Sequence, residues 1–398
     1  MRNQLPQEVK ILLTDADALH SLAALRSFGR KGIKVDCSSH MRYLALSFYS
    51  KYCGRRIVSP DPKNEPEFTE FLSRTLADSH YDVFVPLRSD AQYISAKNQD
   101  ILRGYTNLVL PDFVKMKIAS DKGATFRLAR EIGVDIPETY YITSPSDVDR
   151  IPTLSFPVVL KELTGSGSRG VAYTLDRGQL DARLKNFFDV RGGERILLQE
   201  YIEGDGFGFF SLFRDGEPKA IFMHHRIREY PATGGPSVCA ESYYDSRLRD
   251  AGLRILRHLG WNGVAMVEFK GDRRTGRYKL MEINPKFWGS LALGIASGVD
   301  FPYLYALQAL DIDFDPVFDY KVGLRYRWLF PGDFLNWVSS SFLRYDFYAD
   351  FVRKGVRYDI SLRDPFPHLI QLLMVGGYIW LYRGKIRYPQ GKPMRREK

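Results

Sequence analysis

The amino-acid sequence predicts an α/β front domain followed by an α+β region. Up to about residue 115, strand patterns alternate with helical patterns, and this alternation is the signature of a parallel sheet. From about residue 157 onward, the strands are separated by turns, which favours hairpins. The chain has 398 residues, of which 44% are hydrophobic, so it can fill more than one core.

These patterns divide the chain into three regions. We expect a doubly wound domain in residues 1–115, a second domain in residues 116–311, and a basic, aromatic extension in residues 312–398. Ligands of the first domain would gather at the carboxyl ends of its strands. This domain has no GxGxxG motif, which argues against a dinucleotide site.

Apolar runs define the expected strands, and Gly, Pro and Asp define the turns between them. In the first domain we expect strands at residues 9–13, 32–36, 83–85 and 108–110 and helices at residues 21–30 and 67–77. In the second domain we expect helices at 119–132, 179–188 and 246–259 and strands at 139–142, 158–161, 171–174, 196–201, 208–213, 220–223, 264–270 and 278–283.

A glycine-rich loop at residues 164–170 follows the strand that ends at Lys161. Its small residues include Ser166, Gly167, Ser168 and Gly170. A cation and several unhindered backbone N–H groups would therefore face one polyanion. A flexible hairpin with an exposed lysine is the alternative, because in the GxxxxGK[ST] motif the lysine follows the loop.

Two glutamates in apolar strands suggest a metal site. A short turn separates the strands that carry Glu268 and Glu282, so the two carboxylates can lie side by side on one sheet face. Strand alternation directs Asn284 to the same face. Two carboxylates and an amide oxygen suit Mg²⁺, whereas salt bridges to nearby arginines are the alternative.

The segment Met-Glu-Ile-Asn-Pro-Lys-Phe-Trp-Gly-Ser at residues 281–290 resembles the metal-binding strand and following loop of ATP-grasp enzymes. This superfamily includes carbamoyl-phosphate synthetase, biotin carboxylase and D-alanine–D-alanine ligase. Further segments are similar to that family in the same order, namely Asp121-Lys122, Lys161, residues 198–204 and residues 267–269. The resemblance spans residues 9 to about 310 and implies an ATP-grasp fold behind a Rossmann-like pre-ATP-grasp domain. It also implies a small lid subdomain at about 140–203 and a metal-binding subdomain at about 204–311.

Carried over position by position, the resemblance implies a site for ATP and for one or two Mg²⁺ ions, with Mn²⁺ as an alternative ion. Two lysines would hold the phosphates under the amides of the glycine-rich loop, three hinge residues would frame the adenine, and an aspartate would bind the ribose. The implied ATP residues are Lys122, Lys161, Ser166, Gly167, Ser168, Gly170, Glu200, Tyr201, Ile202 and Asp205, and the implied metal ligands are Glu268, Glu282 and Asn284.

A carboxylate substrate is implied by the same resemblance. Arg226 and Arg228 alternate to one face of an expected strand, from which one or both would face the transferring phosphoryl group. Lys286 stands where many relatives carry arginine, so the positive charge is kept and the bidentate fork is lost. The backbone amides of Gly289 and Ser290 would receive the carboxylate.

The implied activity is ATP-dependent ligation, in which a carboxylic acid becomes an acyl phosphate and then reacts with an amine. A kinase or a carbamoyl-phosphate-forming enzyme is one alternative, and a non-catalytic ATP-binding module at the membrane surface is another. The partners would be small molecules, and relatives suggest a homodimer. Three widely spaced cysteines without a CxxC pair, and an N-terminus without a signal pattern, favour the cytoplasm.

The basic charge belongs to the end of the chain. The net charge is +10, and residues 321–398 alone carry 15 Lys and Arg against six Asp and Glu. Residues 366–382 are apolar but short for a membrane crossing. We favour a helix packed on the protein with a solvated basic end, and the alternative is peripheral contact with the inner face of a membrane. No nucleic-acid-binding module is recognisable, so nucleic acid ranks third.

Overall fold

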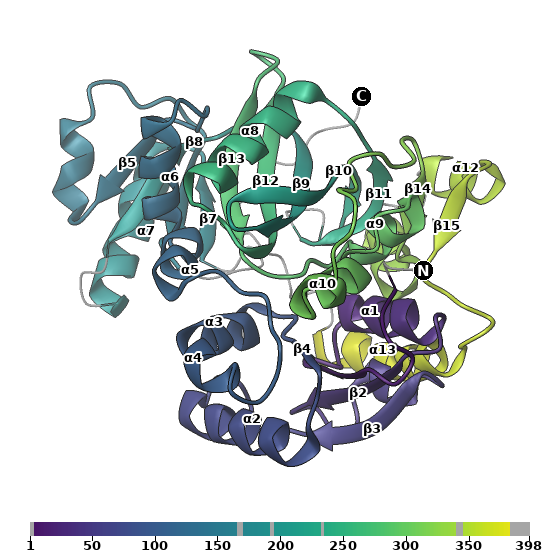
Figure 1. Cartoon of the computed structure of the whole chain (residues 1–398). Coiled ribbons are helices and arrows are strands. Elements are labelled where there is room, and N and C mark those ends of the chain that lie inside the picture. Colours follow the sequence, from purple (N-terminus) through teal and green to yellow (C-terminus); the bar gives the residue numbers. More distant parts are fainter. Residues whose placement is uncertain (1–3, 165–169, 192–194, 232–234, 340–344, 383–398) are drawn as a thin grey trace.

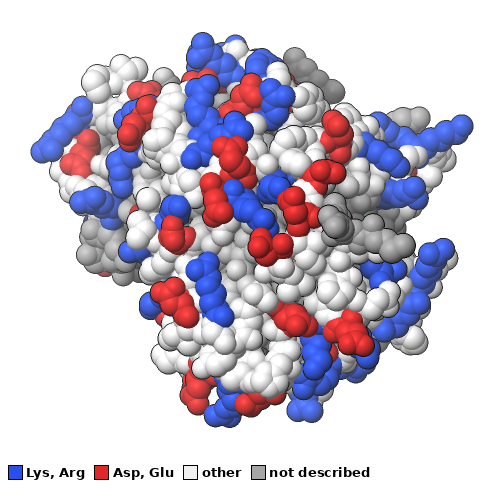
Figure 2. Space-filling view, viewed as in Figure 1, with Lys and Arg blue, Asp and Glu red and all other residues white. Residues whose placement is uncertain are grey.

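The computed structural model describes residues 4–164, 170–191, 195–231, 235–339 and 345–382 (Figure 1). Three sheets organise these residues, and each is built from a continuous stretch of the chain. On the face shown in Figure 2, acidic and basic side chains are interspersed. None of the described helices is both long and apolar enough to cross a bilayer.

The first sheet is parallel throughout and has the strand order β3-β2-β1-β4. Its strands are β1 (Lys10–Leu13), β2 (Lys34–Ser39), β3 (Cys53–Val58) and β4 (Val83–Val85). The helical elements of this region are α1 (Leu19–Gly29), η1 (Leu46–Tyr49), α2 (Glu65–Ser79), α3 (Ser89–Lys97) and α4 (Gln99–Leu102). The predicted parallel α/β unit is therefore present.

One strand expected in this region is wrong. Residues 108–110 form no strand, and only Asn107 makes an isolated bridge to Val83. The apolar side chains of this segment are buried, but the backbone N–H of Val109 forms its hydrogen bond with a side chain and not with a neighbouring strand. The N–H of Val109 donates to the Tyr305 hydroxyl at 2.9 Å, and that hydroxyl donates to the Phe84 carbonyl at 3.2 Å. Tyr305 thus links the first sheet to a helix 221 residues later in the chain.

The second sheet is antiparallel and has the order β5-β8-β6-β7. It contains β5 (Thr139–Ile142), β6 (Val158–Glu162), β7 (Val171–Thr174) and β8 (Ile196–Glu200), with η2 (Pro145–Arg150) and α7 (Arg177–Arg191) beside them. Two helices, α5 (Phe113–Ser120) and α6 (Lys122–Glu131), precede it. The single helix expected at 119–132 is divided at Asp121, whose carboxylate accepts from the Ala124 N–H and so caps α6.

The third sheet has the order β13-β12-β9-β10-β11-β14-β15. Its strands are β9 (Gly204–Arg214), β10 (Glu217–Glu229), β11 (Ser237–Ser242), β12 (Gly263–Asp272), β13 (Tyr278–Asn284), β14 (Arg325–Arg327) and β15 (Val356–Tyr358). The helices α8 (Ser246–His258), α9 (Leu291–Ser297) and α10 (Phe301–Ala309) pack on it. One apolar core runs from Leu13 and Val85 of the first sheet to Phe210, Phe222 and Trp288 around the third. The strand ends of the first sheet therefore lie against the loop that follows β13.

The C-terminal segments pack on the edge of the third sheet and on α1. They comprise η3 (Leu329–Asp333), α11 (Phe334–Ser339), α12 (Tyr345–Val352) and α13 (Phe366–Tyr382), together with β14 and β15. The guanidinium of Arg26 on α1 donates to the Asp364 carboxylate at 2.8 Å and lies 3.2 Å from the His368 ring. Both sides of this contact are buried. The buried ion pair between Arg26 and Asp364 thus joins the C-terminal segments to α1.

Candidate nucleotide and metal site

Two carboxylates face each other at the centre of the candidate site. Glu268 on β12 is the direct cross-strand partner of Glu282 on β13, and Met266 is the partner of Asn284. Asn284 follows Glu282 by two residues, and its amide donates to the Glu282 carboxylate at 2.8 Å. All three polar side chains therefore share one face of the sheet, as the sequence predicts.

Each carboxylate has its own cation. Arg226 donates to Glu268 at 2.6 Å, and Lys122 lies 3.5 Å from Glu282. Burial raises the pKa of Glu268, although Arg226 opposes this effect. Burial also acts to raise the pKa of Glu282, but Lys122, the Asn284 amide and Lys161 outweigh it, and the pKa falls below its usual value. The two carboxyls thus differ, because burial has the larger effect on the pKa of Glu268 and the neighbouring cations and amide have the larger effect on that of Glu282.

Two lysines stand opposite the carboxylates. Lys122 is the first residue of α6, and its backbone N–H donates to the Leu163 carbonyl at 2.9 Å, so the start of the helix is tied to the end of β6. Burial lowers the pKa of Lys161 on β6 to about 8, and the neighbouring charges of Lys122 and Lys270 act in the same direction. A polyanion placed between these lysines would relieve their mutual repulsion.

The residues expected to frame an adenine lie where β8 ends. The Glu200 carboxylate accepts from Lys279 at 3.1 Å, and the Tyr201 ring meets the Tyr173 ring edge-on at 5.6 Å between centroids. The Ile202 carbonyl accepts from the Lys270 ammonium at 2.9 Å. The segment is thus held from both sides, by the second sheet and by β12.

Asp205, the residue expected to bind a ribose, is half-exposed at the start of β9. It pairs with Arg273 at 2.7 Å and lies 3.4 Å from the His225 ring. The hydrogen bond to His225 is the largest of the effects that lower the pKa of the Asp205 carboxyl. A ribose hydroxyl would have to share this carboxylate with both groups.

Of the glycine-rich loop, Ser166, Gly167 and Ser168 lie outside the described residues. Gly170 ends the loop with a φ of 70°, a conformation that side chains rarely adopt. Its carbonyl accepts from the Glu162 N–H at 3.0 Å, which closes the hairpin between β6 and β7. The loop therefore begins and ends next to Lys161, at the mouth of the candidate site.

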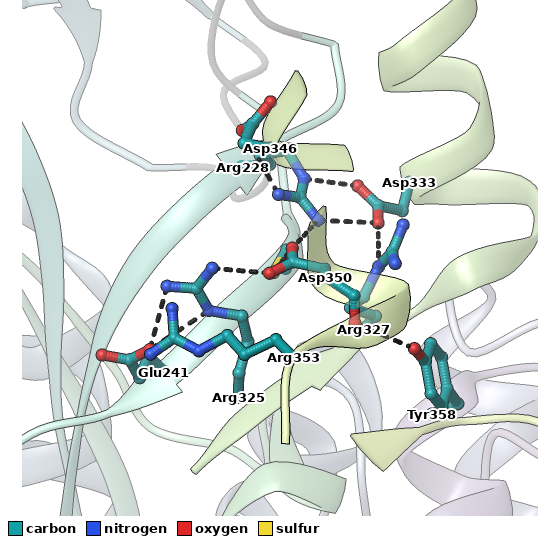
Figure 3. Close-up of polar contacts among 10 residues, drawn as sticks. Arg228, Glu241, Arg325, Arg327, Asp333, Asp346, Asp350, Arg353 and Tyr358 are labelled. Carbon is teal, nitrogen blue, oxygen red and sulfur yellow. Dashed lines mark hydrogen bonds and ion pairs between the residues drawn. The ribbon is translucent and has the colours of Figure 1, made fainter. Parts of the chain in front are cut away.

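The structure brings Arg226 to the site but not Arg228. Arg226 pairs with Ala240 across the strand and Arg228 with Cys239, so Ile227 is an extra residue on β10. Such a bulge reverses the alternation, and the two arginines point to opposite faces. Arg228 is buried instead among the C-terminal acids, with contacts of 2.7 Å to Asp333 and 2.8 Å to Asp350 (Figure 3). The expectation that both arginines share one face is wrong, because it assumed a regular strand.

The loop after β13 faces the strand ends of the first sheet. Burial lowers the pKa of Lys286, and the nearby cation Arg88 acts in the same direction, whereas Glu282 opposes it. Ser290 is buried at the start of α9, and Gly289 precedes it with open space where a side chain would stand. A cavity of about 470 Å³ opens beside this loop. Its lining includes Ser89, Asp90, Lys122, Thr164, Glu282 and Asn284.

Several residues around this loop were missed by the sequence analysis. Arg88 follows β4 and pairs with Asp17 at 2.6 Å, and the partly buried His20 has its pKa lowered to about 3 by desolvation and then by Arg88. Lys270 also escaped notice, although it follows Glu268 by two residues and alternation could have placed it on the same face. The positions of Arg88 and His20 depend on how the first sheet meets the third, and no local pattern predicts that.

The donor set fits a hard divalent cation. It consists of two carboxylates in register and an amide oxygen on one face, next to two lysines suited to phosphate. Within the described ranges, no cluster of three or more His, Cys, Asp or Glu residues stands out as a metal site. The proposed set of Glu268, Glu282 and Asn284 contains only two residues of these four types, so it would not form such a cluster.

Comparison with known proteins gives the same architecture. The profile of a family described as ATP-grasp in the biosynthetic pathway with Ter operon matches residues 194–330. L-amino acid ligase from Bacillus licheniformis has a similar structure, with a TM-score of 0.58 and 17% identity over 77% of this chain and 75% of that chain. N5-carboxyaminoimidazole synthetase from Staphylococcus aureus gives a TM-score of 0.63 and 14% identity over 81% and 82%.

A third similar structure was solved with nucleotide and metal. The biotin carboxylase domain of 2-oxoglutarate carboxylase from Hydrogenobacter thermophilus, in complex with MgADP, ADP and bicarbonate, gives a TM-score of 0.63 and 14% identity. The structural similarity covers 79% of this chain and 73% of the Hydrogenobacter chain. The chain described here has the ATP-grasp fold, and the predicted resemblance to that superfamily is confirmed.

Proposed function

We propose that this protein is an ATP-dependent ligase that activates a carboxylic acid as an acyl phosphate and couples it to an amine. The observation that carries the proposal is the facing pair of Glu268 and Glu282, with Asn284 on the same face and Lys122 and Lys161 opposite. This arrangement offers separate places for a divalent cation and for a polyphosphate. A fold alone would not support an activity, but this site does.

In this proposal ATP is a substrate that spans the second and third sheets. Lys122 and Lys161 bind its phosphates, and the backbone at 200–202 holds the adenine. Glu268, Glu282 and Asn284 hold one or two Mg²⁺ ions, which neutralise phosphate charge when bound. Asp205 is the candidate for the ribose, and the glycine-rich loop covers the phosphates.

The reaction needs positioning and charge more than proton transfer. An oxygen of the acid bonds to the γ-phosphorus while the bond to ADP breaks, with Arg226 placed near the transferring group. The amine nitrogen then bonds to the acyl carbon and loses a proton, while inorganic phosphate leaves. Lys286 and the amides of Gly289 and Ser290 orient the acid in the cavity beside the first sheet.

A screen of acid and amine pairs for ADP release tests this function. ADP that forms only when both an acid and an amine are present supports ligation. ADP that forms with acid alone, together with a stable phosphorylated product, would replace the proposal with a kinase or a carbamoyl-phosphate-forming enzyme. Absence of ADP with every pair, combined with full biological function of Glu282→Gln, would favour a non-catalytic module.

Three further expectations remain proposals. We retain the three-part division of the chain at residues 115 and 311, the homodimer and the cytoplasmic location. Size-exclusion chromatography with light scattering tests the dimer directly. Limited proteolysis tests the two boundaries, because cleavage should concentrate between domains rather than inside them.

A further inference from the structure

In the first half of the last described helix, α13, two polar side chains are buried and several apolar side chains are exposed. His368 and Gln371 are buried, and the His368 ring lies 3.2 Å from both the Arg26 guanidinium and the Gln371 amide oxygen. The outward positions are apolar, and Leu373 is 77% exposed. They are Phe366, Leu369, Leu372 and Leu373. A helix on a water-exposed surface usually buries its apolar side chains and exposes its polar ones. The exposed apolar side chains here therefore indicate a site of interaction.

Neighbouring segments extend this apolar surface. Leu362 in the loop before α13 is 92% exposed, and Val352 at the end of α12 is 84% exposed. Between the helices lies a cavity of about 560 Å³ with an apolar lining. Its wall includes Phe330, Phe334, Trp337, Phe347, Phe351 and Leu369. We call the exposed apolar side chains of residues 348–373, together with this cavity, the apolar C-terminal surface.

Buried ion pairs lie beside this surface. Arg327 is fully buried and donates to Asp333 at 2.6 Å (Figure 3). Its guanidinium lies 4.6 Å and 4.4 Å from the ring centres of Phe347 and Phe351. Arg228 adds its contacts to Asp333 and Asp350. The apolar surface thus lies next to a buried network of ion pairs and ring contacts.

Charge around the surface is divided by sign. The acids Asp350, Asp359 and Asp364 are buried, whereas Lys354 and Arg363 are exposed. Beyond the described residues, the sequence from 383 to 398 contains seven Lys and Arg and one Glu. Among the described residues, the exposed cations Lys354 and Arg363 lie in the same part of the chain as the apolar side chains, which suits an anionic partner.

We propose that the apolar C-terminal surface docks on an anionic phospholipid bilayer, with α13 lying in the plane of the interface and acyl chains reaching the cavity. Exposed leucines enter the boundary between headgroups and acyl chains, while the surrounding cations attract the lipid charge. A second copy of the chain fits less well, because two such surfaces would bring like charges together.

Vesicle sedimentation of the full chain without ATP tests the proposal. Binding to phosphatidylglycerol vesicles, with at least about tenfold weaker binding to phosphatidylcholine vesicles and a loss in high salt, is expected. Equal binding to both vesicles, or binding to neither, would overturn the proposal. So would a dimer in solution that forms through this surface in place of vesicle binding.

Substitution on the surface gives the second arm of the test. Leu362→Ser with Leu373→Ser should lower the vesicle partition coefficient about tenfold or more, because two apolar side chains leave the lipid. The matched control Ile101→Ser with Val114→Ser changes two exposed apolar residues on α4 and α5 and should bind as the unchanged protein does. Equal binding by both double variants would overturn the proposal. Unchanged thermal unfolding of each shows that folding is not the cause, and the result is independent of the ligase proposal.

Discussion

Glu268 and Glu282 lie directly opposite each other on adjacent antiparallel strands, yet each is neutralised by a cation from a different part of the chain. Arg226 comes from β10 and Lys122 from the start of α6. Two carboxylates at this spacing repel each other unless positive charge lies nearby. A divalent cation between the two carboxylates would add further positive charge. It would compete with Arg226 and Lys122 for the same carboxylate oxygens.

Removal of one carboxylate is expected to stop turnover without unfolding the protein. Glu282→Gln keeps the hydrogen bond to Asn284 but loses the charge, so ADP formation should fall at least about 100-fold and should need more Mg²⁺. A coupled ADP assay over a range of Mg²⁺ concentrations measures both effects. The control is Glu217→Gln. Glu217 is the first residue of β10 and forms an exposed ion pair with Arg257 of α8, so this variant should keep the activity of the unchanged protein. Equal activity of the two variants would show that Glu282 has no part in the reaction.

ATP affinity should depend on pH through Lys161. Below its pKa of about 8 the ammonium is protonated and attracts the phosphates, and above that pH it becomes neutral. Binding of the polyanion raises the pKa of Lys161, so the dissociation constant should rise with pH from about 8 upward, by at most tenfold per unit. Calorimetric titration from pH 7 to pH 10 measures this. Lys161→Arg stays charged over that range, and an identical pH dependence in this variant would contradict the assignment.

Arg228 should contribute to stability and not to chemistry. Arg228→Met leaves the buried Asp333 and Asp350 short of one cation, so the free energy of unfolding should fall by about 3–5 kcal/mol. Urea unfolding followed by circular dichroism gives the difference. Arg257→Met removes an exposed ion pair and should cost less than about 1 kcal/mol. A similar loss in both variants would mean that the buried network adds little.

The buried carboxyl of Asp359 should make the protein less stable as pH rises. Burial raises the pKa of Asp359 to about 7, from a usual value of 3.8, so the native state holds this proton more tightly than the unfolded state does. The stabilisation is complete below about pH 4 and is lost as pH rises through 7. Asp359→Asn has no such proton, so its stability relative to the unchanged protein should improve between pH 4 and pH 7. A difference that stays constant in urea unfolding across this range would refute the assignment.

Local pattern was enough to predict most strands and the centre of the site. Alternation with a period of two places Glu268, Glu282 and Asn284 on one face whatever surrounds them, once the two strands pair. Lys161 could be placed because it ends an apolar strand at a glycine-rich loop. The ATP-grasp fold followed from these motifs in their order, since each depends on residues close together in the chain.

Only the tertiary structure decided which other side chains reach the site and which do not. The bulge at Ile227 turns Arg228 away from Arg226, and the meeting of the first and third sheets brings Arg88 and His20 to Lys286. The buried Arg26 contacts His368 at the start of α13 and Asp364 just before it, while Leu369, Leu372 and Leu373 of the same helix are exposed. The sequence shows which residues are apolar or charged, but burial and ion pairing between distant segments determine the direction in which each one points.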